Sequence, residues 1–315
     1  MESFNTISEV ISRGNISTAA TNLNSKREQI ISYYEGAGPD YFAWSKNYNM
    51  HFGYYEKGMN PFLLEPMLEK LNWEVLQRLE IASNSHSHIA DFGCGLGASL
   101  RYCAKIYPQS NMQGVTIVPW QVEQANTLCS SVDLQDRIEI IESDYTRTPI
   151  ASNSLDGVFA IESGCYANGD AKSDLFREIH RVLKPGGKFV MADGFLKHGK
   201  PLTGFLKLAY DKLCSSWALT ELGNIRQVEK YLNTLNFKKL KIEEISMRMA
   251  PSVAHVPFTV LSFLLRELFV GKQRMTKERW DNLKSPLLTM ILGLARNDFG
   301  YFLVSGRKEE VTCER

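Results

Sequence analysis

From residue 88 onward the chain alternates short apolar runs with stretches whose apolar residues recur every three or four positions. Short apolar runs bounded by turn residues predict buried strands, and the three-to-four spacing predicts amphipathic helices. The expected strands cover residues 88–91, 112–117, 138–142, 154–162, 188–193, 239–247 and 299–306.

The helices expected between these strands cover residues 99–106, 120–131, 171–183, 202–222, 225–235, 256–270 and 276–294. Regular strand–helix alternation predicts an α/β fold with a doubly wound, mostly parallel sheet that is covered on both faces. The run Lys184-Pro185-Gly186-Gly187 is a strong helix stop signal. A helical insertion separates the two final strands, so we expect them to pair antiparallel.

The first 80 residues have a different character. Helical spacing begins at Lys26 and breaks at Gly36, Gly38 and Pro39, and a dense aromatic cluster follows before a further helix over residues 61–79. Residues 1 to about 24 are polar and are expected to dock loosely. We therefore divide the chain into a helical cap and lid (1–80), a ligand-binding core (81–200), and pocket helices with the closing strands of the same sheet (201–315).

Composition is that of an ordinary globular protein, with 315 residues, 44% hydrophobic and 23% charged. A net charge of +1 gives no field that would attract nucleic acid or an anionic membrane. The six cysteines are scattered, without metal-binding spacing, which favours reduced thiols and a cytoplasmic protein. Residues 256–270 are interrupted by Arg266 and Glu267 and look too short to span a bilayer. Whether the chain forms a homo-oligomer is left open.

The stretch HIADFGCGLGAS over residues 88–99 carries the clearest chemistry. Glycines at 93, 95 and 97 allow positive φ and close approach of a ligand, and the helix that follows offers free N–H groups. A dinucleotide site needs its third glycine one residue later and a carboxylate after the next strand. Asp91, just before the loop, instead suits a cationic cofactor that carries an amino acid.

The pattern D-x-G-x-G-x-G resembles the first motif of class I S-adenosylmethionine (SAM) methyltransferases. Four further stretches, GVTIVPWQVEQAN, IESDYTRTPIASNSLDGVFAIES, EIHRVLKPGGKFVMAD and ISYYEGAGPDYF with NMHFGYY, resemble the sterol, γ-tocopherol and cyclopropane-lipid members of that family. The similarity covers about residues 27–197. It implies a Rossmann-like fold, SAM as cofactor, S-adenosylhomocysteine as product, and Mg²⁺ only if the acceptor is a diphosphate.

The resemblance also implies roles for individual residues. Thr116 stands where most of the family has a ribose-binding carboxylate, and Gln121 is the expected polar substitute. Asp144 would accept a hydrogen bond from the adenine amino group, which suits an ionised carboxylate. The alternatives are that Asp91 caps the loop, that Asp144 pins a turn and that Gln121 is solvent-exposed. The expected cofactor-binding residues are Tyr33, Asp91, Gly93, Gly95, Gly97, Thr116, Gln121, Asp144 and Tyr145.

Glu162 follows the fourth strand, where the sterol enzymes carry an acidic residue. Methylation of an alkene carbon leaves a carbocation, which a carboxylate can stabilise and then deprotonate. Tyr166 stands where related enzymes have histidine, and its ring can face a cation. We therefore expect Glu162 and Tyr166 to be catalytic; alternatively, Glu162 hydrogen-bonds a turn at the strand end.

The acceptor is expected to be an apolar small molecule held under the aromatic lid. The expected substrate-binding residues are Tyr48, His51, Tyr54, Tyr55 and His255, although aromatics this dense are often core. Arg248, Lys46 and Lys207 are weaker candidates for holding an anionic head group.

Carbon methylation of an isoprenoid, either a prenyl diphosphate or a sterol-like or prenylquinol-like lipid, is the leading functional hypothesis. One alternative is a small-molecule O- or N-methyltransferase with Glu162 or His255 as general base. A second is a SAM-binding protein without catalysis.

Overall fold

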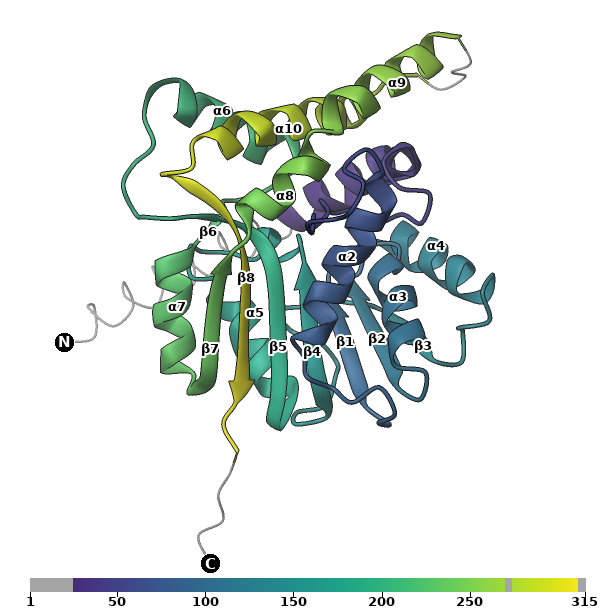
Figure 1. The fold of residues 1–315 in the computed structure, drawn as a ribbon, viewed down its shortest axis with the longest axis vertical. Coiled ribbons are helices and arrows are strands. Elements are labelled where there is room, and N and C mark those ends of the chain that lie inside the picture. The colour runs from purple at the N-terminus through teal and green to yellow at the C-terminus, as the bar shows by residue number, and fades with distance from the viewer. Residues whose placement is uncertain (1–24, 270–273, 311–315) are drawn as a thin grey trace, which may run out of the picture.

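Eight strands form one sheet in the computed structural model, which describes residues 25–269 and 274–310 (Figure 1). Their order is β3-β2-β1-β4-β5-β8-β7, with β6 beside β5. Strands β3, β2, β1, β4 and β5 are parallel, whereas β8 is antiparallel to both β5 and β7. The strands are β1 (His88–Phe92), β2 (Asn111–Thr116), β3 (Ile138–Glu142), β4 (Leu155–Ile161), β5 (Leu183–Leu196), β6 (Gly223–Asn224), β7 (Phe237–Glu244) and β8 (Phe299–Lys308). The expected mostly parallel sheet with an antiparallel close is confirmed.

Helices cover both faces of this sheet. Residues 25–37 form the first described helix and lead into the short helix η1 (Gly38–Ala43). The others are α2 (Leu64–Gln77), α3 (Ala98–Ile106), α4 (Pro119–Ser130), η2 (Gly164–Tyr166), α5 (Ser173–Val182), α6 (Gly204–Ser216), α7 (Ile225–Thr234), α8 (Ser246–Val253), α9 (Val256–Phe269) and α10 (Lys277–Leu294). Buried residues of α2 and α3 pack on one face, and those of α5 and α7 pack on the other.

Some boundaries differ from those expected. The stop signal at residues 184–187 does end α5, but β5 already begins at Leu183, because Leu183 pairs with Leu155. Helix α6 ends at Ser216 rather than 222, two residues before Ala218 takes a positive φ of 52°. The structure also corrects the length of the apolar segment near residue 256. Together, α8 and α9 form a stretch, Ser246–Phe269, that is long and apolar enough to cross a membrane by length and composition.

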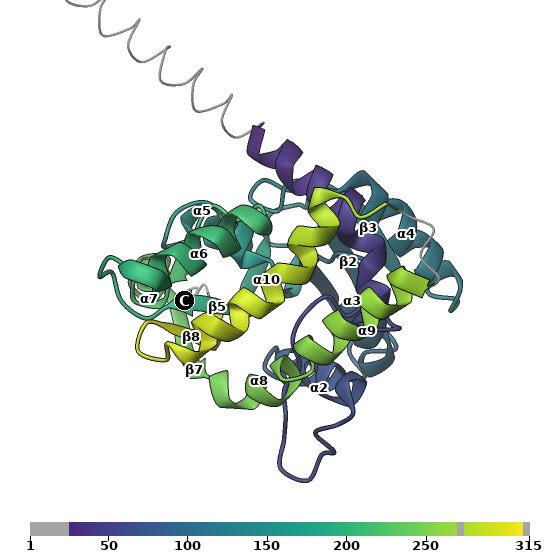
Figure 2. The ribbon, with the colours of Figure 1, turned by 90° about the horizontal axis from the view of Figure 1, so that it is seen from above.

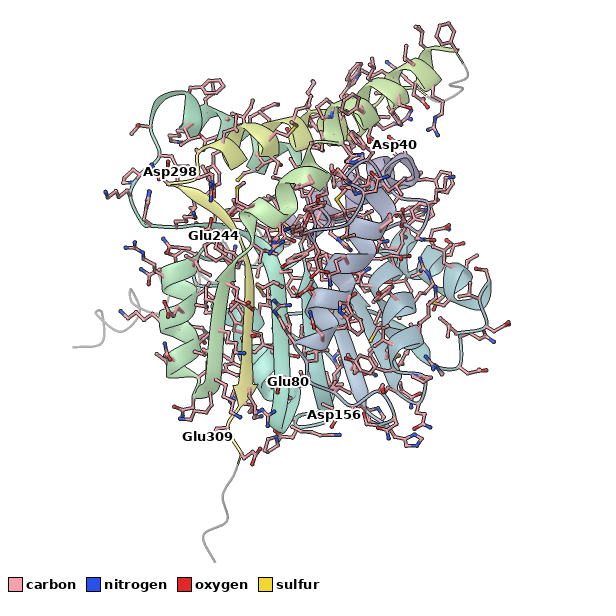
Figure 3. The ribbon with its side chains drawn as sticks, in the orientation of Figure 1. Asp40, Glu80, Asp156, Glu244, Asp298 and Glu309 are labelled. Atoms are coloured by element: carbon pink, nitrogen blue, oxygen red, sulfur yellow. The ribbon has the colours of Figure 1, made fainter. Side chains whose placement is uncertain are left out.

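Three helices, α6, α9 and α10, lie across the edge at which the parallel strands end (Figure 1). Seen from above, α10 runs between α6 and α9 (Figure 2). A buried ion pair ties this cover to the cap, since Arg279 of α10 donates to both carboxylate oxygens of Asp40 in η1 at 2.8 and 3.0 Å. Figure 3 shows Asp40 beside the cover, far from Glu80 and Asp156 at the opposite edge. The space between sheet edge and cover is where a ligand can lie.

The expectation for residues 1 to about 24, together with Val270 and Cys313, falls outside the described residues. The division at residues 80 and 200 stays a prediction, as do the cytoplasmic location and the oligomeric state. The five cysteines within the described ranges are buried and free.

Candidate active site

A cavity of about 390 Å³ lies along the carboxyl ends of β1, β2 and β4. This is the edge at which open α/β sheets bind ligands. The structure brings together here most of the residues expected to bind a cofactor: Asp91, Gly93, Gly95, Thr116, Gln121, Asp144 and Tyr145. We call this space the cofactor cavity.

The glycine loop owes its shape to positive φ angles of 90° at Gly93, 51° at Gly95 and 71° at Gly97. A Cβ atom at Gly93 would lie 2.3 Å from the Cβ atom of Ser163, which is closer than two carbon atoms can approach. Gly93 is therefore required both for its backbone conformation and for the close approach of the segment that follows β4. Gly97 does not line the cavity but takes the left-handed conformation at the N-cap of α3.

The carboxylate of Asp91 is buried at the floor of the cofactor cavity. No hydrogen bond or ion pair to this carboxylate is found within residues 25–269 and 274–310. Loss of hydration raises the pKa of Asp91 well above its usual value. Such a carboxyl group does not cap the loop. It fits a cationic group of a ligand, which would restore the missing counter-charge.

Thr116 and Gln121 act as a pair, because the Thr116 hydroxyl donates to Oε1 of Gln121 at 2.6 Å and both are buried. This bond holds the Gln121 amide against the cavity, so the residue is not an exposed helix position. Asp144 pins a turn, since its Oδ1 accepts from the N–H and the hydroxyl of Thr146 at 2.8 and 2.7 Å. It lines the cavity as well, so the two interpretations of Asp144 are compatible.

Tyr145 fixes the segment that follows β4. Its hydroxyl donates to the carbonyl oxygen of Ser163 at 2.7 Å, and its ring stacks on Phe92 with centroids 6.4 Å apart. The Ser163 hydroxyl in turn donates to the carbonyl oxygen of Phe92. These contacts set the position of Glu162, the residue just before Ser163.

Tyr33, expected to bind the cofactor, does not line the cofactor cavity. Its hydroxyl donates to Oδ1 of Asn282 at 2.9 Å and lies 3.3 Å from the Tyr41 hydroxyl, so the side chain joins the cap to α10. The next residue, Tyr34, lines the cavity instead. Successive helical residues point about 100° apart, and packing against α10 decides which of the two faces the ligand.

A second cavity, of about 190 Å³, lies between the sheet edge and the cover. Its walls are mainly apolar and come from α9, α10, α6 and the segment after α6; they include Leu213, Trp217, Val260, Phe263 and Leu283. We call it the apolar cavity. Five residues line both cavities and form what we call the throat: Tyr34, Met50, His51, Glu162 and Tyr166.

Glu162 occupies the throat in a left-handed conformation, with φ of 49°. Its Oε1 accepts two hydrogen bonds, from the Phe52 N–H at 2.8 Å and from the Tyr301 hydroxyl at 2.9 Å. Removal from bulk water raises the pKa of Glu162 to about 8, although both hydrogen bonds favour the ionised form. The carboxylate contacts the lid and β8 rather than its own turn, and no hydrogen bond to Oε2 is found in the described part of the chain.

Tyr166 also reaches the throat, where its hydroxyl lies 2.9 Å from that of Tyr34. Lys172 fixes the loop around Tyr166: its buried ammonium donates to the carbonyl oxygens of Ala167 and Glu221 at 2.7 and 2.8 Å. Placing Glu162 and Tyr166 between a cofactor cavity and an apolar cavity is the arrangement that a group transfer requires.

The charge of the apolar cavity is informative. Three acidic side chains line it, namely Glu162, Asp193 and Asp40, and none of its described lining residues is lysine or arginine. Arg279 already pairs with both carboxylate oxygens of Asp40, so Glu162 and Asp193 are the two acidic groups left without a basic partner among the lining residues. Asp193 accepts hydrogen bonds from the N–H groups of Cys165 and Gly194 at 2.8 and 2.7 Å, and burial raises its pKa to about 6. This lining offers no positive charge to an anionic acceptor, and it is complementary to a cationic one.

Several residues expected to bind the acceptor lie elsewhere. Tyr48 lines the cofactor cavity, and Tyr54 and Tyr55 line neither cavity; Tyr54 packs under the Arg248 guanidinium, 5.7 Å from its ring centroid. His255 bonds the carbonyl oxygen of Pro61 at 2.8 Å, outside both cavities. Lys46, Lys207 and Arg248 are likewise outside the apolar cavity.

His51 does line the throat, but its ring nitrogens are occupied. They lie 2.7 Å from the Phe52 carbonyl oxygen and 3.1 Å from Oδ1 of Asn72. Burial lowers the pKa of His51. Neither nitrogen is available to take a proton from an acceptor.

Comparison with known proteins decides the family. Residues 90–191, from β1 to β5, match the model of a methyltransferase domain. The chain carries a class I methyltransferase domain. This match confirms the predicted methyltransferase domain, and the likeness to solved structures confirms the Rossmann-like fold.

The relatives of this methyltransferase domain differ in chemistry. A sterol 4-C-methyltransferase of Caenorhabditis elegans is 34% identical over 41% of this chain, a match that covers 37% of that protein's length. A probable chloroplastic tocopherol O-methyltransferase of rice is 23% identical over 89% of this chain and 77% of its own. A geranyl diphosphate C-methyltransferase from Streptomyces coelicolor, solved with Mg²⁺, geranyl diphosphate and S-adenosylhomocysteine, has a TM-score of 0.67 at 16% identity, over 90% of this chain and 97% of its own. The likeness to this geranyl diphosphate C-methyltransferase shows that the two chains share a fold.

Some residues of the methyltransferase site escaped the sequence analysis. Asp193 had a signal, since it ends an expected strand at the edge of the sheet that carries the site. Tyr34 could have been found only by knowing the rotation of its helix. Tyr301, near the start of β8, had no local signal, because antiparallel pairing with β5 brings it to Glu162.

Proposed function

We propose that this protein transfers a methyl group from SAM to a double-bond carbon of an uncharged isoprenoid lipid, such as a sterol or a prenylquinol. The observation that carries the proposal is the position of Glu162, a carboxyl group with raised pKa in the throat between the cofactor cavity and an apolar cavity whose described lining includes no lysine or arginine. The relatives named for carbon methylation of isoprenoids support it.

The residues of the cofactor cavity fit SAM group by group. Asp91 has the unsatisfied charge that an ammonium group requires, and the N–H groups after the glycine loop suit the amino-acid carboxylate. Gln121, held by Thr116, would bind the ribose, and Asp144 would accept from the adenine amine. When bound, SAM supplies an electrophilic methyl group on a sulfonium.

The chain's own contribution lies in the apolar cavity and the throat. Apolar walls hold the acceptor and exclude water, so that its double bond lies against the throat. Positive charge that develops on the acceptor faces Oε2 of Glu162 and the rings of Tyr34 and Tyr166. Glu162 then takes the proton that the methylated acceptor loses, while the Phe52 N–H and the Tyr301 hydroxyl keep Oε1 in place.

The acceptor class follows from charge. A diphosphate buried in this cavity would meet Glu162 and Asp193 and no lysine or arginine among the described lining residues, since Arg279 is paired with Asp40. The described residues also hold no cluster of metal-ligating side chains for a bridging Mg²⁺. An unpaired buried charge costs several kcal/mol, on the order of a thousandfold in affinity. We therefore favour the neutral lipid over the prenyl diphosphate.

A phenol O-methyltransferase is the second candidate, and Glu162 supports it too. A carboxyl group with a pKa of about 8 can accept a phenolic proton, and a tocopherol O-methyltransferase is among the relatives.

The test uses the purified chain with methyl-labelled SAM and a panel of sterols, prenylquinols and prenyl diphosphates. Mass spectrometry measures transfer and NMR locates the new methyl group. We expect a new carbon–carbon bond on a neutral lipid, and a loss of kcat of at least about 100-fold in Glu162→Gln. Glu123→Gln, on the exposed face of α4, is the matched control and should retain full activity. Transfer to oxygen would support the second candidate, and preference for a diphosphate would contradict the charge argument.

A further inference from the structure

Helix α9 has apolar side chains on both of its faces. Val256, Val260 and Phe263 point inward and line the apolar cavity. On the outer face, Phe258 is 74% exposed and Leu268 is 76% exposed. A surface helix of a soluble protein normally carries polar residues on its outer face. Packing in the protein core therefore does not explain the apolar side chains on the outer face of α9.

The neighbouring helices continue this surface. Helix α10 adds exposed Leu287, Ile291 and Leu294, and α6 adds Phe205 and Leu208. These helices lie side by side across the top of the molecule (Figures 1 and 2). We call their exposed apolar side chains the apolar cover face. Contiguous patches of this kind mark interaction sites for proteins or membranes.

The charges around the apolar cover face are mostly positive. Arg266, Lys277 and Lys284 are exposed on α9 and α10. Arg266 and Lys277 pair with Glu267 and Asp281 at 3.5 and 3.7 Å, but these carboxylates are mostly buried, so the basic side chains are the ones that reach the surface. The Lys284 ammonium lies over the exposed ring of Trp280, 5.6 Å from its centroid. Tryptophan and basic residues beside an apolar surface are typical of the boundary between lipid and water.

We propose that the apolar cover face docks this protein on the surface of an anionic lipid bilayer. The stretch Ser246–Phe269 is long and apolar enough to span a bilayer, and only 17% of its most apolar window is buried. Its inner face is nevertheless fixed to the protein: the Phe263 ring packs against the Arg279 guanidinium, 5.3 Å away. A helix held on one side can lie in the interface but cannot cross the membrane.

A bilayer fits this surface better than a second copy of the chain. A symmetric dimer through the same face would bring the exposed basic residues of the two copies together. Anionic lipids instead attract these residues, each by about 1 kcal/mol. The helices that form this face also wall the apolar cavity, so a lipid acceptor could pass from the membrane to the cavity. Only this last step rests on the proposed function; the docking itself does not.

The experiment is flotation of the full chain with vesicles of phosphatidylcholine, alone or mixed with phosphatidylglycerol. We expect the chain to float with the mixed vesicles. Combining Phe258→Ser, Leu265→Ser and Leu268→Ser should lower the bound fraction at least ten-fold. The matched control combines Trp73→Ser and Val132→Ser, at exposed apolar positions away from the cover, and should float like the parent chain.

A charge variant, Arg266→Glu with Lys284→Glu, should lose binding to the anionic vesicles selectively. Thermal unfolding of each variant checks that the fold is kept, and methyl transfer to a detergent-dispersed acceptor tests the proposed function separately. A parent chain that does not float with either vesicle would overturn the docking proposal. So would a sedimentation result in which the triple substitution converts a dimer to a monomer without changing flotation.

Discussion

The hydroxyl of Tyr301 donates a hydrogen bond to Oε1 of Glu162 over 2.9 Å, although 139 residues separate the two in the chain. Tyr301 lies on β8, which joins the sheet antiparallel to β5 and so brings the ring to the carboxyl edge of β4. The bond favours the ionised form of Glu162 against the effect of burial. A residue of the last strand therefore influences the pKa of the carboxyl group in the throat.

Tyr301→Phe removes this bond and should raise the pKa of Glu162 further, since only the Phe52 N–H would then favour the carboxylate. Because Glu162 acts in its ionised form, the acid limb of the kcat/KM profile should move to higher pH. The free energy of unfolding should fall by about 1 kcal/mol. Tyr54→Phe, outside both cavities, is the control for the profile. An unchanged profile in Tyr301→Phe would separate Tyr301 from catalysis.

Glu162 should also make stability depend on pH. Its pKa is about 8 in the folded chain against 4.5 as the ordinary value, so the unfolded chain releases the proton first as pH rises. The folded state therefore loses stability between about pH 4.5 and pH 8. Glu162→Gln has no carboxyl group at this position, so its free energy of unfolding should rise relative to that of the parent chain across this pH range. The difference is at most about 5 kcal/mol, because one pKa unit corresponds to about 1.36 kcal/mol.

Urea unfolding of both proteins at a series of pH values measures this difference. Asp193, whose pKa is also raised, is present in both proteins, but its charge contributes to the raised pKa of Glu162, so the measured difference includes the coupling between the two carboxyl groups. If the difference in free energy of unfolding between the two proteins does not change with pH, Glu162 keeps an ordinary pKa.

Binding of SAM should release protons. At pH 7 a carboxyl group with a pKa of about 8 is mainly protonated, and a sulfonium near the throat favours its ionised form. Calorimetry in two buffers of different ionisation enthalpy should detect this release. It should be smaller for S-adenosylhomocysteine, which lacks the sulfonium charge, and smaller for Glu162→Gln, whereas any proton that Asp91 releases on meeting the ammonium group is common to all three measurements. Equal release by the parent chain and Glu162→Gln would assign the proton to another group.

Gly93→Ala should abolish cofactor binding. Its φ is 90°, and the added Cβ would lie 2.3 Å from the Ser163 side chain, so the loop or β4 must shift. We expect a loss of about 2 kcal/mol or more in stability. Gly169→Ala is the matched control: φ is 74°, but a Cβ there meets nothing within 4 Å, so only backbone strain remains. Equal effects of the two substitutions on SAM affinity would contradict this account.

Much of the fold could be predicted because its signals are local. The glycine loop requires positive φ wherever the loop lies, and strand–helix alternation leaves few topologies once parallel pairing is assumed. The boundaries of β5 and α6 could not be predicted, since the pairing of Leu183 with Leu155 and the turn at Ala218 depend on neighbours distant in sequence.

The sequence by itself determined the family, the glycine loop, Asp91 and the place of Glu162 at a strand end, because each depends on backbone conformation within a few residues. Only the tertiary structure decided that Tyr34 rather than Tyr33 lines the cofactor cavity, that Tyr54, Tyr55 and His255 lie outside the cavities, and that the apolar cavity has no described basic lining residue. The physical reason is that helix rotation, burial and the charge of a cavity result from packing between distant segments. A pattern along one segment carries no information about that packing.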